Sequence, residues 1–276
     1  MPPTEKIRSA IGVRTRARRV AMTARQSAWR MGLQHTNPDT AGSVVTVSPT
    51  TIIVLGMHRS GTSVVAGMLE DQGFASGASA EGHVGDNMRG MREHPRLVNL
   101  NQEILSLNKA SWRTPPTDCV RFTRSQLRRR NKLLASARPR VLKDPRMLLM
   151  PEFWCQTHMP TIGVIRNPVA VSYSLRRRDL RLGDNECLDL WETYNLRLLG
   201  LLSQRPFPVI EFGGSRAIST QITAALCFYG FRAEQTFSFF DPRAVRGAPD
   251  EHEWRRLVSP SLVELWDQIL ARAVHL

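Results

Sequence analysis

The chain has 276 residues, of which 42% are hydrophobic and 22% charged, a composition ordinary for a globular protein and sufficient for one sizeable α/β domain. Lys and Arg outnumber Asp and Glu by 38 to 24, so the formal net charge is +14, which favours an anionic partner such as nucleic acid, a membrane surface or a polyanionic small ligand. No helix-turn-helix, zinc-finger or RNA-binding pattern occurs, so we expect no nucleic-acid partner.

The cysteine and histidine spacings bear on redox state and metals. The four cysteines lie more than thirty residues apart with no C-x-x-C pair, which is typical of reduced thiols in an intracellular protein. The seven histidines include no H-E-x-x-H or paired ligand spacing, so we expect no metal site.

Residues 1–49 form an Arg-rich, acid-poor segment. It has no apolar run long enough for a signal peptide or a membrane span. Two hypotheses stay open: a disordered, solvated tail, or a peripheral helix that lies on an anionic membrane face. Pro38 and Pro49 bracket a linker, so the folded domain is predicted to cover residues 50–276.

The next segment, 51–67, reads TIIVLGMHRSGTSVVAG and predicts a strand, a glycine-bounded turn and a helix. In such a turn the backbone N–H groups point inward and the helix N-terminus adds its positive dipole end, which together make a site for a phosphate. The residues predicted to bind this anion are Gly56, His58, Arg59, Ser60, Gly61, Thr62 and Ser63.

The spacing of Gly56 and Gly61 matches the nucleotide-binding pattern G-x-x-x-x-G-K-[ST], with one departure. Thr62 stands where the lysine is expected, and the cation lies inside the turn as Arg59. An arginine can bind a terminal anionic group through two parallel hydrogen bonds, but this is not the usual ATPase arrangement.

Beyond the helix, residues 71–90 are rich in Gly, Ala and Ser without periodicity, which indicates a lid or binding loop. Pro95 to Leu107 then have the apolar spacing of a helix. Glu93 and His94 therefore stand at the entrance of a helix, where a carboxylate could serve as a general base.

The rest of the chain alternates between strands and helices. The predicted elements are a basic helix over 121–140, a strand at 141–142, a helix over 148–154, a strand over 161–165, a helix from 169 to the arginines at 176–178, a helix over 186–204, a strand over 207–212, a helix over 216–229 and a last helix that begins at Ser259–Pro260. This alternation predicts an α/β fold of the three-layer P-loop type, with a mostly parallel central sheet flanked by helices. Ligands bind at the C-terminal strand ends of such sheets, so Gly56, Lys143 and Arg166 should converge there.

Four motifs together resemble the sulfotransferases that use 3′-phosphoadenosine-5′-phosphosulfate (PAPS). The sequence GMHRSGTS at 56–63 is similar to their 5′-phosphosulfate loop in an arginine-bearing version, and Arg166 with Ser174 eight positions later is similar to their 3′-phosphate site. The sequence KDPR at 143–146 resembles an element of tyrosylprotein and many bacterial members, and the segment 87–94 resembles the bacterial carbohydrate-type branch. The resemblance spans about residues 51–231, and the strand end at 211–214 departs from the family pattern.

This resemblance implies PAPS as the co-substrate, no metal, and an acceptor hydroxyl on a carbohydrate or glycolipid. Arg59 and Lys143 would place positive charge on the bridging oxygen, with Glu93 as the base and His94 and Asp144 as rival bases. Thr62 and Ser63 would hold the 5′-phosphate, as Arg166 and Ser174 would hold the 3′-phosphate.

The sequence thus predicts a cytoplasmic O-sulfotransferase with peripheral contact to the inner membrane face as a further hypothesis. Two alternatives remain: an ATP-dependent small-molecule kinase of the same fold, which Thr62 at the lysine position disfavours, and a non-catalytic relative that binds anions or membranes.

Overall fold

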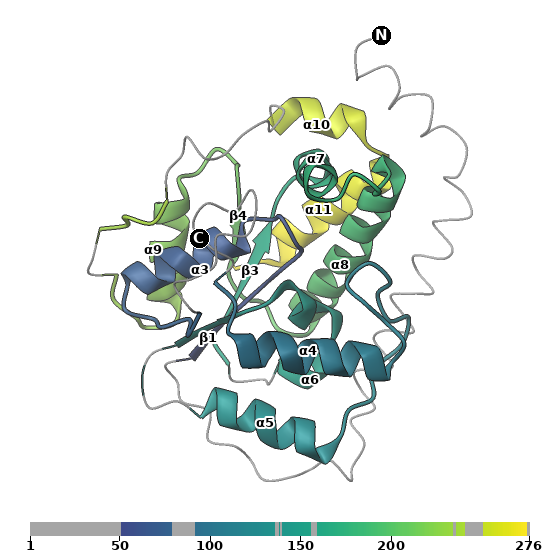
Figure 1. Ribbon diagram of the computed structural model, residues 1–276. Coiled ribbons are helices and arrows are strands. Elements are labelled where there is room, and N and C mark those ends of the chain that lie inside the picture. The colour runs from purple at the N-terminus through teal and green to yellow at the C-terminus, as the bar shows by residue number, and fades with distance from the viewer. Residues whose placement is uncertain are drawn as a thin grey trace.

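The computed structural model describes residues 51–78, 92–135, 138, 140–155, 159–233, 236–240 and 251–274 (Figure 1). The predicted arm at 1–49, most of the predicted lid at 71–90 and the first part of the 87–94 motif lie outside the described residues.

At the centre lies a sheet of four parallel strands in the order β2-β1-β3-β4. The strands are β1 (Thr51–Gly56), β2 (Arg140–Lys143), β3 (Thr161–Ile165) and β4 (Val209–Glu211). Val54 lies opposite Lys143 and Gly56 opposite Val164, so the C-terminal ends of the three neighbouring strands β2, β1 and β3 meet at one edge. The prediction of an α/β fold with a parallel central sheet is confirmed.

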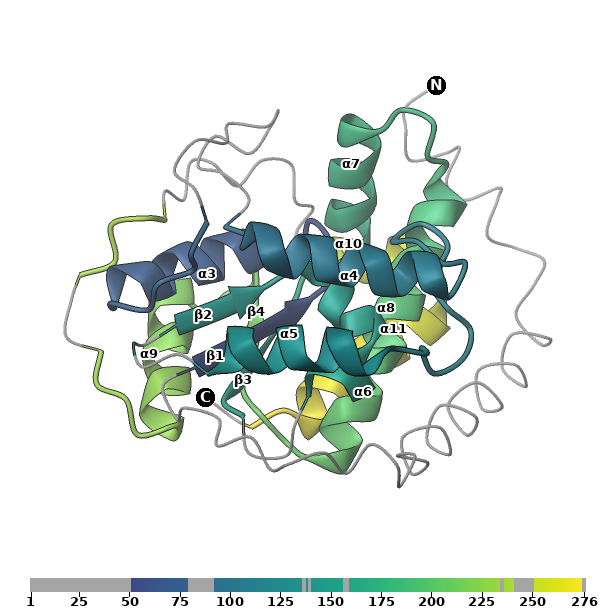
Figure 2. The same ribbon diagram turned by 60° about the horizontal axis from the view of Figure 1, so that its bottom comes forward.

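Helices cover both faces of this sheet (Figures 1 and 2). They are α3 (Thr62–Asp71), α4 (Pro95–Leu107), α5 (Arg124–Leu134), the short 3₁₀ helix η2 (Pro145–Leu149), α6 (Pro151–Trp154), α7 (Pro168–Arg178), α8 (Asp184–Gln204), α9 (Ile218–Phe228), α10 (Glu251–Leu257) and α11 (Pro260–Arg272). Alternate residues of β1 divide between the layers, because side chains along a strand point to opposite faces. Ile52 and Val54 pack with α3 and α9, whereas Ile53 and Leu55 pack with the larger layer that includes α4, α8 and α11.

Most predicted elements are present, and four need correction. The basic helix is only α5, and the predicted 207–212 strand is only β4. The single helix predicted over 148–154 is two short ones, η2 and α6, because Pro151 has no N–H to continue a helix and Met150 before it is non-helical, with φ −140° and ψ 57°. The sequence pattern does not predict α10.

The last helix begins at Pro260 with Ser259 at the N-cap position, as predicted. The Ser259 hydroxyl bonds the Ser261 hydroxyl at 2.9 Å and makes no capping bond to the helix backbone. Among the described helices, none is both long and apolar enough to cross a membrane. The part of the chain described here also contains no group of three His, Cys, Asp or Glu side chains that could hold a metal ion.

Candidate active site

The turn between β1 and α3 has the geometry of an anion-binding loop. Arg59 and Gly61 both adopt left-handed backbone conformations, with φ of 67° and 93°. Gly61 is required there for a second reason, since a Cβ at this position would overlap the Phe212 ring. Gly61 at the N-cap position makes no side-chain cap bond, so the positive end of the α3 dipole faces the turn, which favours an anion there.

Lys143 ends β2 and reaches the start of α3. Its Nζ donates a hydrogen bond to Ser63 Oγ at 2.9 Å and another to Glu93 Oε1, also at 2.9 Å. Only 2% of Lys143 is exposed. Burial lowers the pKa of Lys143, although the Glu93 carboxylate opposes that shift.

This placement explains how the loop functions without a lysine of its own. Thr62 occupies the lysine position of the nucleotide-binding pattern and is buried. Because β2 is the neighbour of β1 and Val54 pairs with Lys143, the adjacent strand delivers an ammonium group to the same helix N-terminus. The Lys143 ammonium group therefore lies beside the start of α3, although Lys143 is some 80 positions away in the sequence.

Two further cations of the site, Arg59 and Arg166, lie beside each other. Arg59 Nε donates to Ser174 Oγ on α7 at 2.7 Å, and Arg166 Nη1 donates to the Arg59 backbone oxygen at 3.3 Å. Arg59 thus contacts both Arg166 and Ser174, the two residues that the family resemblance assigns to the 3′-phosphate. These three residues come from three separate segments of the chain.

Arg166 is held in place by packing, and no carboxylate in the described part of the chain forms an ion pair with it. Its guanidinium lies 5.3 Å from the Phe212 ring centroid, and its backbone oxygen accepts a bond from Trp191 Nε1 at 2.9 Å. Burial and the Arg59 charge lower the pKa of Arg166 to about 10. Its Nε is buried and has no hydrogen-bond partner among the described residues, as expected of a group that binds a ligand anion.

The three candidate bases have different surroundings. Glu93 lies between Lys143 Nζ and Arg146 Nη1, which is 3.9 Å from Glu93 Oε2. Asp144 is fully buried, and its oxygens accept bonds from the Arg146 backbone N–H, Arg146 Nη1 and Asn101 Nδ2 at 2.9–3.0 Å. His94 caps α4, where its Nδ1 accepts from the Arg96 N–H at 3.1 Å. Glu93 is therefore the carboxylate beside the lysine, whereas Asp144 and His94 have structural partners.

His58 has an environment that its sequence pattern does not predict. Its ring lies 5.0 Å from the Trp112 ring and 6.0 Å from that of Tyr194, and its buried Nε2 has no partner among the described residues. The Tyr194 hydroxyl donates to the Trp112 backbone oxygen at 3.2 Å, which fixes the loop that carries Trp112 over the turn. Burial, followed by the charges of four cations including Arg146, lowers the pKa of His58 well below its usual value.

The neutral His58 makes stability depend on pH. In the unfolded chain a histidine binds a proton below about pH 6.5, but the folded chain resists that proton, so stability is present above this pH and is lost as the pH falls, by up to about 1.4 kcal/mol per pH unit. We expect His58→Phe, which keeps a ring against Trp112, to flatten the fall in unfolding free energy between about pH 7.5 and about pH 5.5. Chemical denaturation at several pH values measures this.

His94→Gln is the comparison variant, with a smaller expected effect because His94 is only partly buried. If the unfolding free energy of His58→Phe and that of the unmodified chain fall equally with pH, the pH dependence does not come from His58.

All predicted site residues lie in the described part of the chain and surround the turn. Gly56 ends β1 under Val164, where an added Cβ would lie 2.6 Å from the Val164 oxygen, and Ser60 is buried with its N–H bonded to the Met57 oxygen at 3.2 Å. Four residues that contact this site have no role predicted from the sequence: Arg146, Phe212, Trp112 and Tyr194. Arg146 ends the KDPR motif, which is a signal for it, but no local pattern indicates the aromatic residues.

The fold and this geometry define an α/β domain of the P-loop type with a cationic site at the C-terminal ends of its strands. No protein-family model matches the chain, and neither does any curated protein. Among solved structures, the chain is similar to the sulfotransferase domain of the olefin synthase from Synechococcus PCC 7002, with 16% identity, a TM-score of 0.47, and coverage of 82% of this chain and 95% of that one. A similarity of this size does not bear on function, which must come from the side chains.

Proposed function

We propose that the chain is a sulfotransferase that transfers the sulfuryl group of PAPS to an acceptor hydroxyl. The observation that carries this proposal is the convergence of Arg59, Lys143 and Arg166, from the ends of three adjacent parallel strands, on a phosphate-binding turn without its own lysine. Such a site offers separate cations to two anionic groups of one ligand.

The residues present fit PAPS. The buried Nε of Arg166, with Ser174, would hold the 3′-phosphate, the group that distinguishes this nucleotide from ATP. Thr62, Ser63 and the first N–H groups of α3 would hold the 5′-phosphate. The co-substrate supplies the activated sulfuryl group, and the protein supplies position and charge.

Three side chains would act at the reacting centre. The Lys143 and Arg59 cations would stabilise negative charge on the bridging oxygen, as cations do in phosphoryl transfer. Glu93, 2.9 Å from Lys143, would accept the proton of the acceptor hydroxyl. We further propose a carbohydrate or glycolipid acceptor and a cytoplasmic location with peripheral membrane contact, based on the sequence resemblance and the basic arm.

Nucleotide binding tests this proposal directly. We expect 3′,5′-bisphosphoadenosine to raise the melting temperature in the presence of a metal chelator, and ADP to raise it weakly, because at equal concentration the ligand that binds more tightly stabilises the folded state more. Differential scanning fluorimetry with both nucleotides measures this. Equal stabilisation by ADP, or a requirement for Mg²⁺, would favour the ATP-dependent kinase.

The matched variant is Arg166→Ala. It should weaken binding of 3′,5′-bisphosphoadenosine by about 1.5–3 kcal/mol, the size of a charge-assisted hydrogen bond, and leave ADP binding unchanged. Arg129→Ala, on the exposed helix α5, controls for the loss of one positive charge. Loss of affinity for both nucleotides would mean that Arg166 supports the fold and does not recognise the 3′-phosphate.

A further inference from the structure

The C-terminal end of α7 carries an exposed basic and apolar surface that the sulfotransferase site does not use. Figure 2 shows α7 standing beside the C-terminal strand ends, with its last turn projecting away from the sheet. Leu180 just beyond the helix is 90% exposed, and Tyr173 on α7 is 52% exposed. Exposed arginines surround them. We call this surface the α7 ridge, which consists of Tyr173, Arg176, Arg177, Arg178, Leu180 and Arg181.

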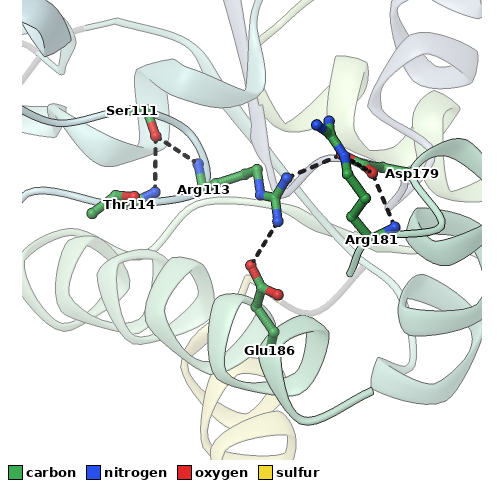
Figure 3. A network of polar contacts seen from close by, with 6 residues as sticks. All are labelled: Ser111, Arg113, Thr114, Asp179, Arg181 and Glu186. Carbon is green, nitrogen blue, oxygen red and sulfur yellow. Dashed lines mark hydrogen bonds and ion pairs between the residues drawn. The ribbon is translucent and has the colours of Figure 1, made fainter. Parts of the chain in front are cut away.

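Polar contacts hold the ridge in shape. Asp179 accepts hydrogen bonds from Arg181 Nε at 2.9 Å and from Arg113 Nη1 at 3.1 Å, and Arg113 also bonds Glu186 on α8 (Figure 3). Two residues further along the chain, Leu182 is buried in the core. These contacts hold the turn in place with Leu180 exposed to solvent. Transfer of the Leu180 side chain from water to apolar surroundings would be favourable.

The chemistry of the ridge distinguishes among anionic partners. The ridge has four arginines within six residues, of which Arg176 pairs with Asp184 and Arg181 with Asp179. The positive charge that remains would attract any polyanion, including a soluble glycan. A polyanion gains nothing from an exposed leucine, however, whereas a lipid surface accepts leucine and tyrosine at the boundary between headgroups and acyl chains. Arginines interleaved with exposed apolar side chains are the composition of interfacial membrane contacts.

We propose that the α7 ridge docks on the surface of an anionic lipid bilayer. The ridge also adjoins the candidate active site, because Ser174 on the same helix accepts the hydrogen bond from Arg59 Nε. Arg178 is near enough for its charge to contribute to the lowered pKa of His58. Docking would bring the entrance of the site to the membrane, and this second step, which rests on the proposed function, points to an amphiphilic, membrane-borne acceptor.

The test uses the full chain, so that the basic arm contributes equally to every variant. Co-sedimentation with mixed phosphatidylcholine–phosphatidylglycerol vesicles should show a bound fraction that the double variant Tyr173→Ser, Leu180→Ser lowers by about tenfold. Phe228→Ser is the matched control, because Phe228 is 50% exposed on α9 in a different layer, and it should bind like the unmodified chain. Unmodified binding by the double variant would overturn the proposal.

A triple variant, Arg176→Gln, Arg177→Gln, Arg178→Gln, separates a membrane from a soluble polyanion. If it loses vesicle binding while the double apolar variant does not, the ridge is a general polyanion site and the proposal is wrong. Stabilisation of each variant by 3′,5′-bisphosphoadenosine is measured in parallel. If the variants are still stabilised by the nucleotide but bind vesicles as well as the unmodified chain does, the membrane contact alone is refuted. If the nucleotide does not stabilise the unmodified chain, the sulfotransferase proposal alone is refuted.

Discussion

Replacing Lys143 by methionine is expected to lower turnover by about 10²–10³-fold while the affinity for 3′,5′-bisphosphoadenosine changes little. The Lys143 ammonium group lies 2.9 Å from Ser63 Oγ at the N-terminus of α3, where a ligand anion would sit. In the proposed reaction the loop amides and Arg59 would share the anionic charge of the ground state, so one missing cation should have a small effect. As the bridging oxygen became anionic, the buried ammonium would contribute most, because few water molecules screen it.

Methionine is chosen because it keeps an unbranched apolar side chain of similar length and removes the charge. The measurement is release of 3′,5′-bisphosphoadenosine from PAPS in the presence of an acceptor extract, with affinity followed separately by thermal shift. Lys132→Met, on the exposed surface of α5, controls for the loss of one lysine and should remain at full activity. A variant that loses nucleotide affinity and turnover in the same proportion would mean that Lys143 binds the ground state and has no special role in the transition state.

The convergence of the site could be predicted from the sequence because it follows from topology. Each of Gly56, Lys143 and Arg166 ends or directly follows an apolar run that alternates with helical segments. Parallel strands bring such positions to one edge whatever the details of packing.

The contacts within the site could not be predicted, because they depend on side-chain packing between distant segments. Asp144 follows the lysine in sequence as closely as any catalytic acid could, yet Asn101 and Arg146 take up its oxygens. Trp112 lies against His58, and its backbone oxygen accepts a hydrogen bond from Tyr194, 82 positions away. Neither arrangement leaves a periodic pattern in the sequence.

The predicted helix over 148–154 is wrong because a proline interrupts a segment whose apolar residues have helical spacing. Leucines and aromatic residues continue at helical spacing across 148–154, but Pro151 interrupts the hydrogen-bond ladder. The break has a consequence for the site, since η2 begins with Pro145 and its N-cap is Asp144. The carboxylate that seemed a rival base from sequence is thus the cap of a short helix.

Glu93→Gln is expected to have the largest effect on turnover, a loss of about 10²–10⁴-fold, with nucleotide affinity nearly unchanged. A neutral hydroxyl is a poor nucleophile, and its proton must leave as the bond to sulfur forms. Among the three candidate bases, Glu93 is the one that hydrogen-bonds Lys143, whose ammonium group also bonds Ser63 in the first turn of α3. Glutamine keeps the volume and can still accept a hydrogen bond from Lys143 Nζ, so the variant removes the base and little else.

The comparison with the rival bases decides the assignment. Glu264→Gln, on the exposed side of α11, is the control for removing one carboxylate and should be fully active. Asp144→Asn should lower the melting temperature, because it weakens the charge-assisted bonds to Arg146, and its residual activity should follow the fraction folded. If Glu93→Gln retains near-normal turnover while His94→Ala loses it, the base is misassigned within an otherwise correct site. If folded Glu93→Gln, His94→Ala and Asp144→Asn proteins all turn over normally, the proton leaves directly to water, and the Glu93 carboxylate serves to hold the Lys143 ammonium group in position.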